Sequence, residues 1–345
     1  MNVQPIGGSG TLERVPTIGM SGIGFAATRR IAPRPMARAR LAPSRGLALL
    51  LLGVASLTPA LATARADGIL ARCWTAEDLR NGSGGGAPAV SRDEPSLPSV
   101  ADLPPGLRGV IRSVRPAGDE KVVALTFDLC ESDGPPSGYD APLVAYLRDN
   151  DVRATFFAGG KWLRSHPEPA QQLMADPRFE IGSHSWSHKD FRKLAPAQRV
   201  AQIRDVQTEY ARLRAGLARR ECAIAAGSHA LHAIPAQPAL FRFPYGWCDA
   251  ASLATVTGAG LPAIQWSIVT GDPAKGQSAE AIARVILERV KPGAIVVAHA
   301  NGRGWHTAEA LRKVVPELRR RGYRFVTVSE LLASGEPVIA DRCDQ

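Results

Sequence analysis

The sequence predicts an α/β fold in which a parallel sheet closes into a barrel of about seven strands. Short apolar runs, typical of strands covered on both faces, alternate with longer amphipathic stretches typical of helices. The first such run is Val122–Phe127, and the strand–helix units that follow it continue through residue 333. A single barrel accommodates this number of units more readily than an open two-domain sheet does.

The expected elements follow from the positions of apolar residues and of helix-breaking Pro and Gly. Strands are expected at residues 122–127, 154–157, 179–181, 241–243, 262–266, 294–298 and 323–328. Helices are expected near Leu143–Leu147, at residues 162–174, 196–220 and 278–290, from Thr307 to Leu318, and at 329–333. Ser278 is a typical N-cap for its helix, which Pro292-Gly293 ends.

The positive charge of the chain lies mainly at its N-terminal end. The 345 residues carry a formal net charge of +10. Residues 1–66 contain eight arginines and one acidic residue, Glu13, so +7 of that charge lies there and +3 in the remainder. We therefore expect no nucleic-acid partner.

The N-terminal residues have the layout of a secretory signal peptide. A basic stretch, Met36–Arg45, precedes an apolar run, Leu47–Leu57, and a small-residue cleavage site, Ala64-Arg65-Ala66. The apolar run is short for a membrane span, so we expect no stable span after cleavage, although an uncleaved anchor is the alternative. Translation is expected to start at Met36. The protein is then exported, to the periplasm or the medium.

Four regions are expected: a leader at 1–66, a loose Gly/Pro/Ser-rich segment at 67–118, the main domain at 119–333 and a C-terminal tail at 334–345. The loose segment has one expected short helix near Thr75–Leu79. In an exported protein the five cysteines can form disulfides. Cys73 could pair with Cys343, and Cys222 with Cys248, which leaves Cys130 free; spacing alone does not determine the connectivity.

Polar side chains follow several of the expected strands. Asp128 and Glu131 follow the first strand and His184 and His188 the third. Later strands are followed by Arg242, Tyr245, Trp266, Asp272 and His299. Because chemistry in parallel barrels occurs at the C-terminal ends of the strands, we expect these side chains to converge.

Two imidazoles and one carboxylate with an open position form a typical hydrolytic zinc site. A bound metal would activate water and polarise a carbonyl, while a second carboxylate serves as base and a further histidine as acid. His184 and His188 taken alone could also be two surface histidines on a helical turn. The complete set indicates amide or ester hydrolysis at a metal.

These residues occur in five ordered motifs: Thr126-Phe127-Asp128, His184-x-x-x-His188, Arg242-Phe243-Pro244-Tyr245-Gly246, Trp266 and Ile295–His299. In this order they resemble the NodB-type polysaccharide deacetylases, carbohydrate esterase family 4, over about residues 119–333. The resemblance implies a distorted (β/α) barrel. It also implies removal of N-acetyl groups from N-acetylglucosamine polymers, or of O-acetyl groups from xylan, with one divalent metal, Zn²⁺ or Co²⁺.

The resemblance also implies roles for individual residues. Asp128 would be the base, oriented by Arg242, and His299 the acid, with its pKa set by Asp272. Tyr245 would donate its backbone N–H to the oxyanion, and His184 and His188 would bind the metal. Trp266 would pack beside the acid, and Trp186 and Trp247 are the better candidates for stacking on sugar rings.

One position departs from the family pattern. Where the family has a second Asp that binds the metal, this chain has Leu129, within Thr126-Phe127-Asp128-Leu129-Cys130-Glu131. Glu131 is the favoured third ligand. Alternatively, Asp128 itself binds the metal, or the site binds metal poorly. Cys130 is a lesser candidate ligand, since a buried structural thiol is the more usual state.

Two other functions remain open at this point. One is a glycan-binding protein that has lost its metal, and the other is a hydrolase of a different linear amide. The polysaccharide itself, and the oligomeric state, do not follow from the sequence.

Overall fold

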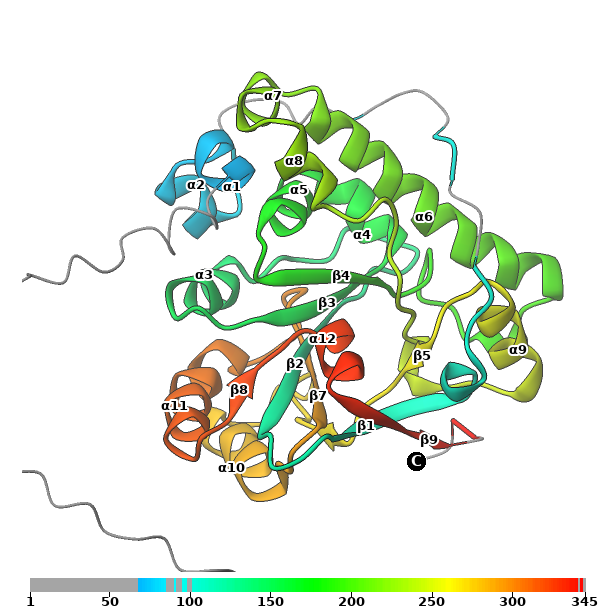
Figure 1. The fold of residues 1–345 in the computed structure, drawn as a ribbon, viewed down its shortest axis with the longest axis vertical. Coiled ribbons are helices and arrows are strands. Elements are labelled where there is room, and N and C mark those ends of the chain that lie inside the picture. Colours follow the sequence, from blue (N-terminus) through cyan, green and yellow to red (C-terminus); the bar gives the residue numbers. More distant parts are fainter. Residues whose placement is uncertain (1–67, 85–89, 91–94, 98–100, 341, 344–345) are drawn as a thin grey trace, which may run out of the picture. The chain divides into compact units, whose positions relative to one another are not determined.

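Nine strands form one mixed sheet in the computed structural model, which describes residues 68–84, 90, 95–97, 101–340 and 342–343. The strands are β1 (Val110–Pro116), β2 (Val122–Leu129), β3 (Ala154–Ala158), β4 (Phe179–Ser183), β5 (Ala263–Ile264), β6 (Ile268–Val269), β7 (Ala294–His299), β8 (Arg324–Phe325) and β9 (Gly335–Ala340). Their order is β4-β3-β2-β7-β1-β5, with β8 beside β2 and β9 beside β1 (Figure 1). The short strand β6 pairs with β7.

The sheet curls into a distorted barrel. Strands β4, β3, β2 and β7 are parallel neighbours, whereas β1 runs antiparallel to β7 and β9. Phe241 makes single bridges to Ser183 of β4 and to Ala263 of β5. This one residue links the two ends of the strand path. The predicted barrel class is confirmed, although the sheet is mixed and not wholly parallel.

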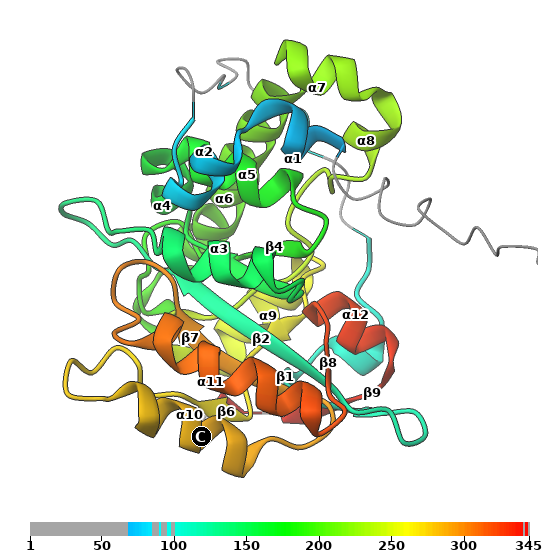
Figure 2. The same ribbon diagram turned by 90° about the vertical axis from the view of Figure 1, so that its left-hand side faces the viewer.

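The helices of the described residues surround the strands. They are α1 (Gly68–Cys73), α2 (Ala76–Asn81), α3 (Ala141–Asp149), α4 (Gly160–Ser165), α5 (Pro167–Ala175), α6 (Pro196–Ala218), α7 (Glu221–Ala226), α8 (Ser228–His232), α9 (Ala250–Gly258), α10 (Ala279–Arg289), α11 (Thr307–Arg320) and α12 (Val328–Ala333). Figure 2 shows α11 and α10 along one side of β2 and β7, with α3 to α6 on the other. None of these helices is long and apolar enough to cross a membrane.

Side-chain alternation along β2 determines which residues face the barrel interior. All eight residues of β2 are buried. Leu125, Phe127 and Leu129 belong to the apolar cluster beneath the helices, whereas Val122 and Ala124 belong to a smaller cluster that lies between the strands. Successive strand residues point to opposite faces. Asp128 therefore continues the inward series and Leu129 the outward one.

Several expected elements differ in the structure. The helix expected at 162–174 is divided into α4 and α5 at Pro167, because proline lacks the N–H that would continue the helix. The strand expected at 241–243 is reduced to the bridges of Phe241, and that at 323–328 to β8.

Two strands lie outside the expected domain boundaries of 119–333. Strand β1 lies in the segment expected to be loose, and β9 in the expected tail, and the two pair with each other. Their sequences gave weak signals, because arginines interrupt β1 and a partly exposed edge position lets β9 contain Pro337. The predicted signal peptide, cleavage site and start at Met36 lie outside the described residues.

The expected disulfide pairing was wrong, although Cys130 is free as expected. The bridges join Cys73 to Cys222 and Cys248 to Cys343, with Cα atoms 5.2 and 5.3 Å apart. Helix α1 packs against α7, which brings Cys73 to Cys222. Cys248 and Cys343 are both buried in one apolar cluster. Packing of the terminal segments, and not distance along the sequence, thus determines the pairs.

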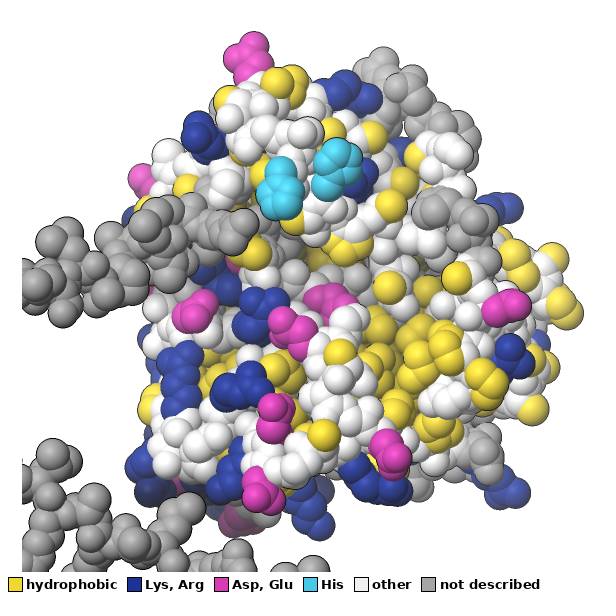
Figure 3. All heavy atoms as spheres, viewed as in Figure 1, with side chains coloured by type: hydrophobic (Ala, Val, Ile, Leu, Met, Phe, Trp, Pro, Cys, Tyr) yellow, Lys and Arg dark blue, Asp and Glu magenta, His cyan; other side chains and the backbone are white. Residues whose placement is uncertain are grey.

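The face of the molecule seen in Figure 3 has no continuous basic area among its described side chains. Lysine and arginine side chains lie mainly in its lower part with acidic side chains among them, apolar side chains gather right of its centre, and two histidines are exposed together near its upper edge. Helix α8 contains an exposed pair, His229 and His232.

We expect non-reducing peptide mapping of the protein to show the linkages Cys73–Cys222 and Cys248–Cys343 and one free thiol, Cys130. Replacing either pair by alanines should lower the free energy of unfolding in urea by about 2–4 kcal/mol, because each bridge closes a long loop of the unfolded chain. A peptide linking Cys73 to Cys343 would contradict the packing described here.

Candidate active site

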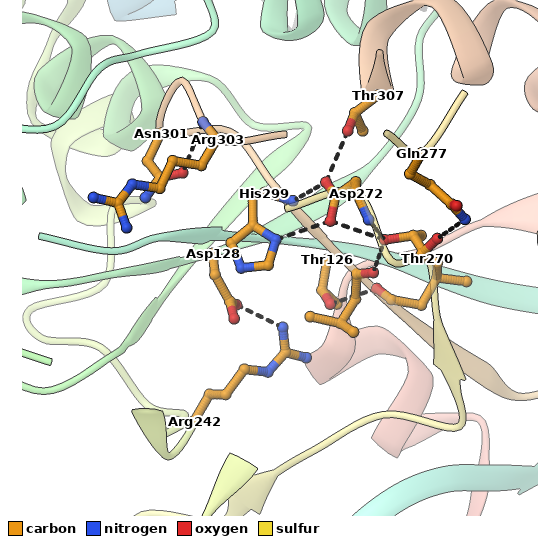
Figure 4. Close-up of polar contacts among 12 residues, drawn as sticks. Thr126, Asp128, Arg242, Thr270, Asp272, Gln277, His299, Asn301, Arg303 and Thr307 are labelled. Carbon is orange, nitrogen blue, oxygen red and sulfur yellow. Dashed lines mark hydrogen bonds and ion pairs between the residues drawn. The ribbon is translucent and has the colours of Figure 1, made fainter. Parts of the chain in front are cut away.

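Two polar side chains meet where neighbouring parallel strands end. Asp128 on β2 and His299 on β7 are register partners, and both follow the inward face of their strands. Arg242 lies across from Asp128, with its Nη1 donating to Asp128 Oδ1 at 2.8 Å (Figure 4). Arg242 is fully buried, and its Nε donates to the carbonyl of Ile264. The carboxylate thus has a fixed cationic partner away from solvent.

The environment of Asp128 keeps it ionised. Burial alone would raise the pKa of this carboxyl group, but the charges of Arg242, His184 and His299 outweigh burial, so its pKa lies below the ordinary value. Breaking such a buried pair at one end is costly, since the other charge is left unpaired.

The histidine pair lies in the loop after β4. His184 Nδ1 is 3.0 Å from the carbonyl of Arg242, which leaves Nε2 facing the site. That Nε2 is buried with no hydrogen-bond partner among the described residues, 3.6 Å from Asp128 Oδ2. The ring of His188 is centred 4.9 Å from that of His184. Ser185 and His188 have φ of 65° and 54°, an uncommon conformation that concentrates at functional sites.

Cys130 joins this pair. The ligand atoms of Cys130, His184 and His188 all lie within 4.8 Å of one another. Burial would raise the pKa of the Cys130 thiol, but His184, His188 and His299 lower it well below the ordinary value. A thiolate and two imidazoles, one with an unpartnered buried nitrogen, suit a zinc ion with an open position. The residues present therefore fit a divalent metal.

Glu131, the favoured third ligand, is not part of this cluster. Its carboxylate is buried and accepts hydrogen bonds from the N–H and hydroxyl of Ser137, at 3.1 and 3.3 Å, and from the hydroxyl of Ser165, at 2.7 Å. Glu131 therefore anchors the loop beyond Cys130. The geometry does not support its expected role as metal ligand, because Glu131 belongs to neither group of candidate ligands among the described residues, and the three hydrogen bonds hold its Oε2 at Ser137 and Ser165.

His299 is held by a buried carboxylate. Its Nδ1 lies 2.9 Å from Asp272 Oδ1, and its backbone N–H donates to Asp272 Oδ2 at 2.7 Å. The hydroxyls of Thr270 and Thr307 donate to the same carboxylate (Figure 4). Burial would lower the pKa of His299, but Asp272 and Cys130 raise it well above the ordinary value. The ring thus presents its second nitrogen to the site.

The Arg242–Gly246 motif ends in a tight turn at the site. Tyr245 and Gly246 have φ of 61° and 71°. A side chain at Gly246 would meet the ring of Trp266 at 2.7 Å, so only glycine fits there. The ring of Tyr245 is centred 4.4 Å from that of His188. The role of the Tyr245 N–H toward an oxyanion stays a prediction.

Two adjoining pockets open at these residues and share His188, Tyr245, Pro273 and His299. The larger has a volume of about 470 Å³, and its other lining residues are Cys130, Glu131, Ser132, Pro135, Pro136, Ser137, Asn301 and Arg303. The smaller, about 200 Å³, is also lined by Asp128, Trp266, Val269, Thr270, Gly271, Asp272 and Val297. The base and acid candidates therefore lie at the floor of an open groove.

Comparison with known proteins identifies the family. Residues 115–264 match the family described as polysaccharide deacetylase. A peptidoglycan-N-acetylglucosamine deacetylase of Bacillus cereus is 32% identical over 217 residues, which cover 62% of this chain and 89% of the relative. The chain belongs to the polysaccharide deacetylase family.

Two further members of the family are similar to this chain over much of their own length. A chitin deacetylase of Colletotrichum lindemuthianum is 29% identical over 61% of this chain and 79% of the relative. The crystal structure of the Bc1960 peptidoglycan N-acetylglucosamine deacetylase superposes with a TM-score of 0.53 at 27% identity, and covers 67% of this chain and 95% of that one. The distorted barrel is thus the fold of solved family members.

The three tryptophans expected at the site have different positions in this member of the family. Trp266 lines the smaller pocket, and Trp247, 46% exposed, packs 4.9 Å from the ring of Tyr245. Trp186 lies in a separate pocket, where the guanidinium of Arg164 covers its ring at 4.5 Å. The structure therefore brings Trp266 and Trp247 to the site but not Trp186.

Sequence reasoning gave too little weight to residues that the structure places at the site. As a metal ligand, Cys130 was ranked below Glu131. Side chains two residues apart on a strand share a face, so Cys130 is expected on the same inward face as Asp128, and this signal could have favoured Cys130. Asn301 and Thr307, which hold Cys130 and Asp272, were not found. No spacing rule links them to their partners, because those contacts form only when β2, β7 and their loops are packed together.

Leu129 is expected to be a core residue and not a damaged ligand position. Leu129→Asp should lower the free energy of unfolding by about 3 kcal/mol or more, because it buries a charge in an apolar cluster, and should not increase metal binding. Urea unfolding and metal analysis provide the measurements. The Leu129→Asn variant, whose side chain has the shape of aspartate without its charge, separates the effect of charge from that of shape. A stable Leu129→Asp protein that binds metal more tightly would contradict this placement.

Proposed function

We propose that this protein is an exported, metal-dependent deacetylase that removes N-acetyl groups from a polysaccharide containing N-acetylglucosamine. The observation that carries the proposal is the convergence of two polar pairs, Asp128 with Arg242 and His299 with Asp272, on a Cys–His–His cluster. The relatives from Bacillus cereus and Colletotrichum lindemuthianum are described as a peptidoglycan-N-acetylglucosamine deacetylase and a chitin deacetylase.

The metal would be held by His184, His188 and Cys130, and zinc suits this donor set best. A bound divalent ion would supply a Lewis acid for the acetyl carbonyl and lower the pKa of water. The carbonyl of Arg242 fixes the ring of His184 so that Nε2 faces the cluster. Asn301 Nδ2 donates to the carbonyl of Cys130 at 2.9 Å and fixes the loop that carries the thiol. These outer contacts orient the ligands before the ion arrives.

Asp128 is the proposed general base. Its carboxylate is ionised, and Arg242 occupies Oδ1, so that Oδ2 faces the cluster near His184 Nε2. It can accept a proton from water placed there. General-base catalysis by a positioned group contributes about 10²- to 10⁴-fold to the rate.

His299 is the proposed general acid. Its raised pKa keeps the ring protonated near neutral pH, and Asp272 occupies its Nδ1. The second ring nitrogen can therefore give its proton to the amine that leaves when the amide bond breaks. The carboxylate of Asp272 orients and stabilises the charged ring, as in other carboxylate–histidine pairs.

The smaller pocket suits the acetyl group. Trp266, Val269 and Val297 provide apolar walls for a methyl group beside Asp128. The Tyr245 N–H in the adjoining turn is the proposed donor to the oxygen on which negative charge develops. The larger pocket then takes the sugar ring, and Trp247 offers an exposed aromatic surface to a neighbouring sugar.

Export is supported by the cysteines. Disulfides persist in oxidising compartments and are rare in the cytosol. Two bridges, Cys73–Cys222 and Cys248–Cys343, connect the described ends of the chain to the domain. Together with the signal-peptide layout of the leader, they favour a periplasmic or secreted protein.

The protein from Asp67 onward is expected to contain about one zinc per chain and to release acetate from N-acetylglucosamine oligomers. Cys130→Ser should lose most of the metal and the activity, because a hydroxyl is a poor zinc ligand, whereas Glu131→Gln should keep the metal. Metal analysis beside acetate release measures both.

The Asp128→Asn variant tests whether Asp128 acts as the general base or as a metal ligand. The variant should retain zinc and lose activity by about 10²-fold or more; loss of the metal would instead make Asp128 a ligand. Zinc without acetate release would favour a different amide substrate. Glycan binding with neither metal nor acetate would overturn the enzyme proposal.

A further inference from the structure

One cation on the wall of the larger pocket has no partner within the described part of the chain. Arg303 follows β7 on the loop that begins at His299 and lines the groove. Its backbone N–H donates to Asn301 Oδ1, but its guanidinium makes no hydrogen bond or ion pair with any described residue. It is an exposed side chain, so its five N–H donors remain available to a ligand.

The backbone of Arg303 is tied to the proposed metal site. Asn301, only 2% exposed, accepts from the Arg303 N–H at 3.3 Å and donates to the carbonyl of Cys130 at 2.9 Å. The carbonyl of Asn301 accepts from the N–H of Gly138 at 2.9 Å. Figure 4 shows Asn301 and Arg303 side by side, beyond His299. The two hydrogen bonds of the Asn301 side chain therefore fix the position of the Arg303 backbone relative to Cys130.

The acidic groups Glu131 and Asp133 near the groove are held by partners other than Arg303. Glu131 is buried, and its hydrogen bonds to Ser137 and Ser165 direct its carboxylate into the loop. Asp133, beside the lining residue Ser132, lies between the two lysines Lys161 and Lys189.

A second cation stands near the same loop. The Lys275 ammonium lies 5.3 Å from the centre of the ring of Trp305, whose N–H donates to the carbonyl of Asp272. Asp272 precedes Pro273, which lines both pockets. Two cations, Arg303 and Lys275, therefore lie on or near this loop.

From these observations we infer that the groove is built for an acetylated glycan that carries carboxylate groups, and that Arg303 binds a carboxylate next to the reacting sugar. The inference rests on the proposed deacetylase function and names its substrate class. A guanidinium and a carboxylate form paired, charge-assisted hydrogen bonds, stronger than those to a neutral hydroxyl. A neutral polymer would leave Arg303 in water and gain nothing from it.

The test compares glycans that differ in charge alone. One is an N-acetylated glycan strand with a carboxylate on alternate sugars, and the other is the same strand after conversion of its carboxylates to carboxamides. Wild-type protein should show a kcat/KM about tenfold higher on the carboxylate form, as expected for one such contact. A third strand that also keeps its attached peptides tells a sugar-borne carboxylate from a peptide-borne one.

Arg303→Ala should remove this preference, so that kcat/KM becomes equal on the carboxylate and carboxamide strands, whereas Arg303→Lys should keep part of it. Arg115→Ala is the matched control, because it removes one arginine that pairs with Glu336 on β9 and does not line the groove. An equal preference in wild type and Arg303→Ala, or a wild-type preference for the neutral strand, would overturn the inference.

Binding is measured beside turnover, so that the two proposals fail separately. If no strand releases acetate, the deacetylase proposal fails, and calorimetry of wild type and Arg303→Ala with the two strands still decides the charge preference. Tighter binding of the carboxylate strand that is lost in Arg303→Ala supports the inference in that case. Equal affinities overturn it.

Discussion

The buried ion pair of Arg242 and Asp128 organises this barrel. Arg242 joins two strands and the loop after β4, since its guanidinium reaches Asp128 of β2 and the carbonyl of Ile264 of β5, and its own carbonyl orients His184. A charge pair taken out of water is stable only when its remaining donors are satisfied. The surrounding backbone supplies those partners, so the base, one proposed ligand and the closing edge of the sheet are placed by one side chain.

The departure at Leu129 leaves the alternation of β2 intact. Leu129 continues the outward apolar face, and Cys130 returns to the inward face beside Asp128. On the proposed assignment, a thiolate provides the third donor in place of a carboxylate. Softer sulfur ligands select zinc over hard cations such as Mg²⁺ and Ca²⁺. The site then keeps an anionic donor, while Glu131 is released to hold the loop that forms one wall of the groove.

Local sequence patterns predicted more of the fold than of the metal site. The apolar runs of β2 and β7 and the capping residue Ser278 specify their elements through neighbouring residues alone, and the structure agrees. Strand β9 and the disulfide partners depend on contacts across the whole chain, so spacing could not reveal them. The choice between Cys130 and Glu131 as third ligand depends on which side chain points inward. Ser137 and Ser165 hold the Glu131 carboxylate away from the histidines, and these contacts can be seen only in the folded structure.

The central claim is that Cys130 completes the metal site, and the absorption spectrum of the Co²⁺-loaded protein from Asp67 onward tests it most directly. A cobalt–thiolate bond gives a charge-transfer band in the near ultraviolet. We predict this band in the wild-type protein and in Glu131→Gln, and its loss in Cys130→Ser. A spectrum that Cys130→Ser leaves unchanged, or that Glu131→Gln alone alters, would contradict the account.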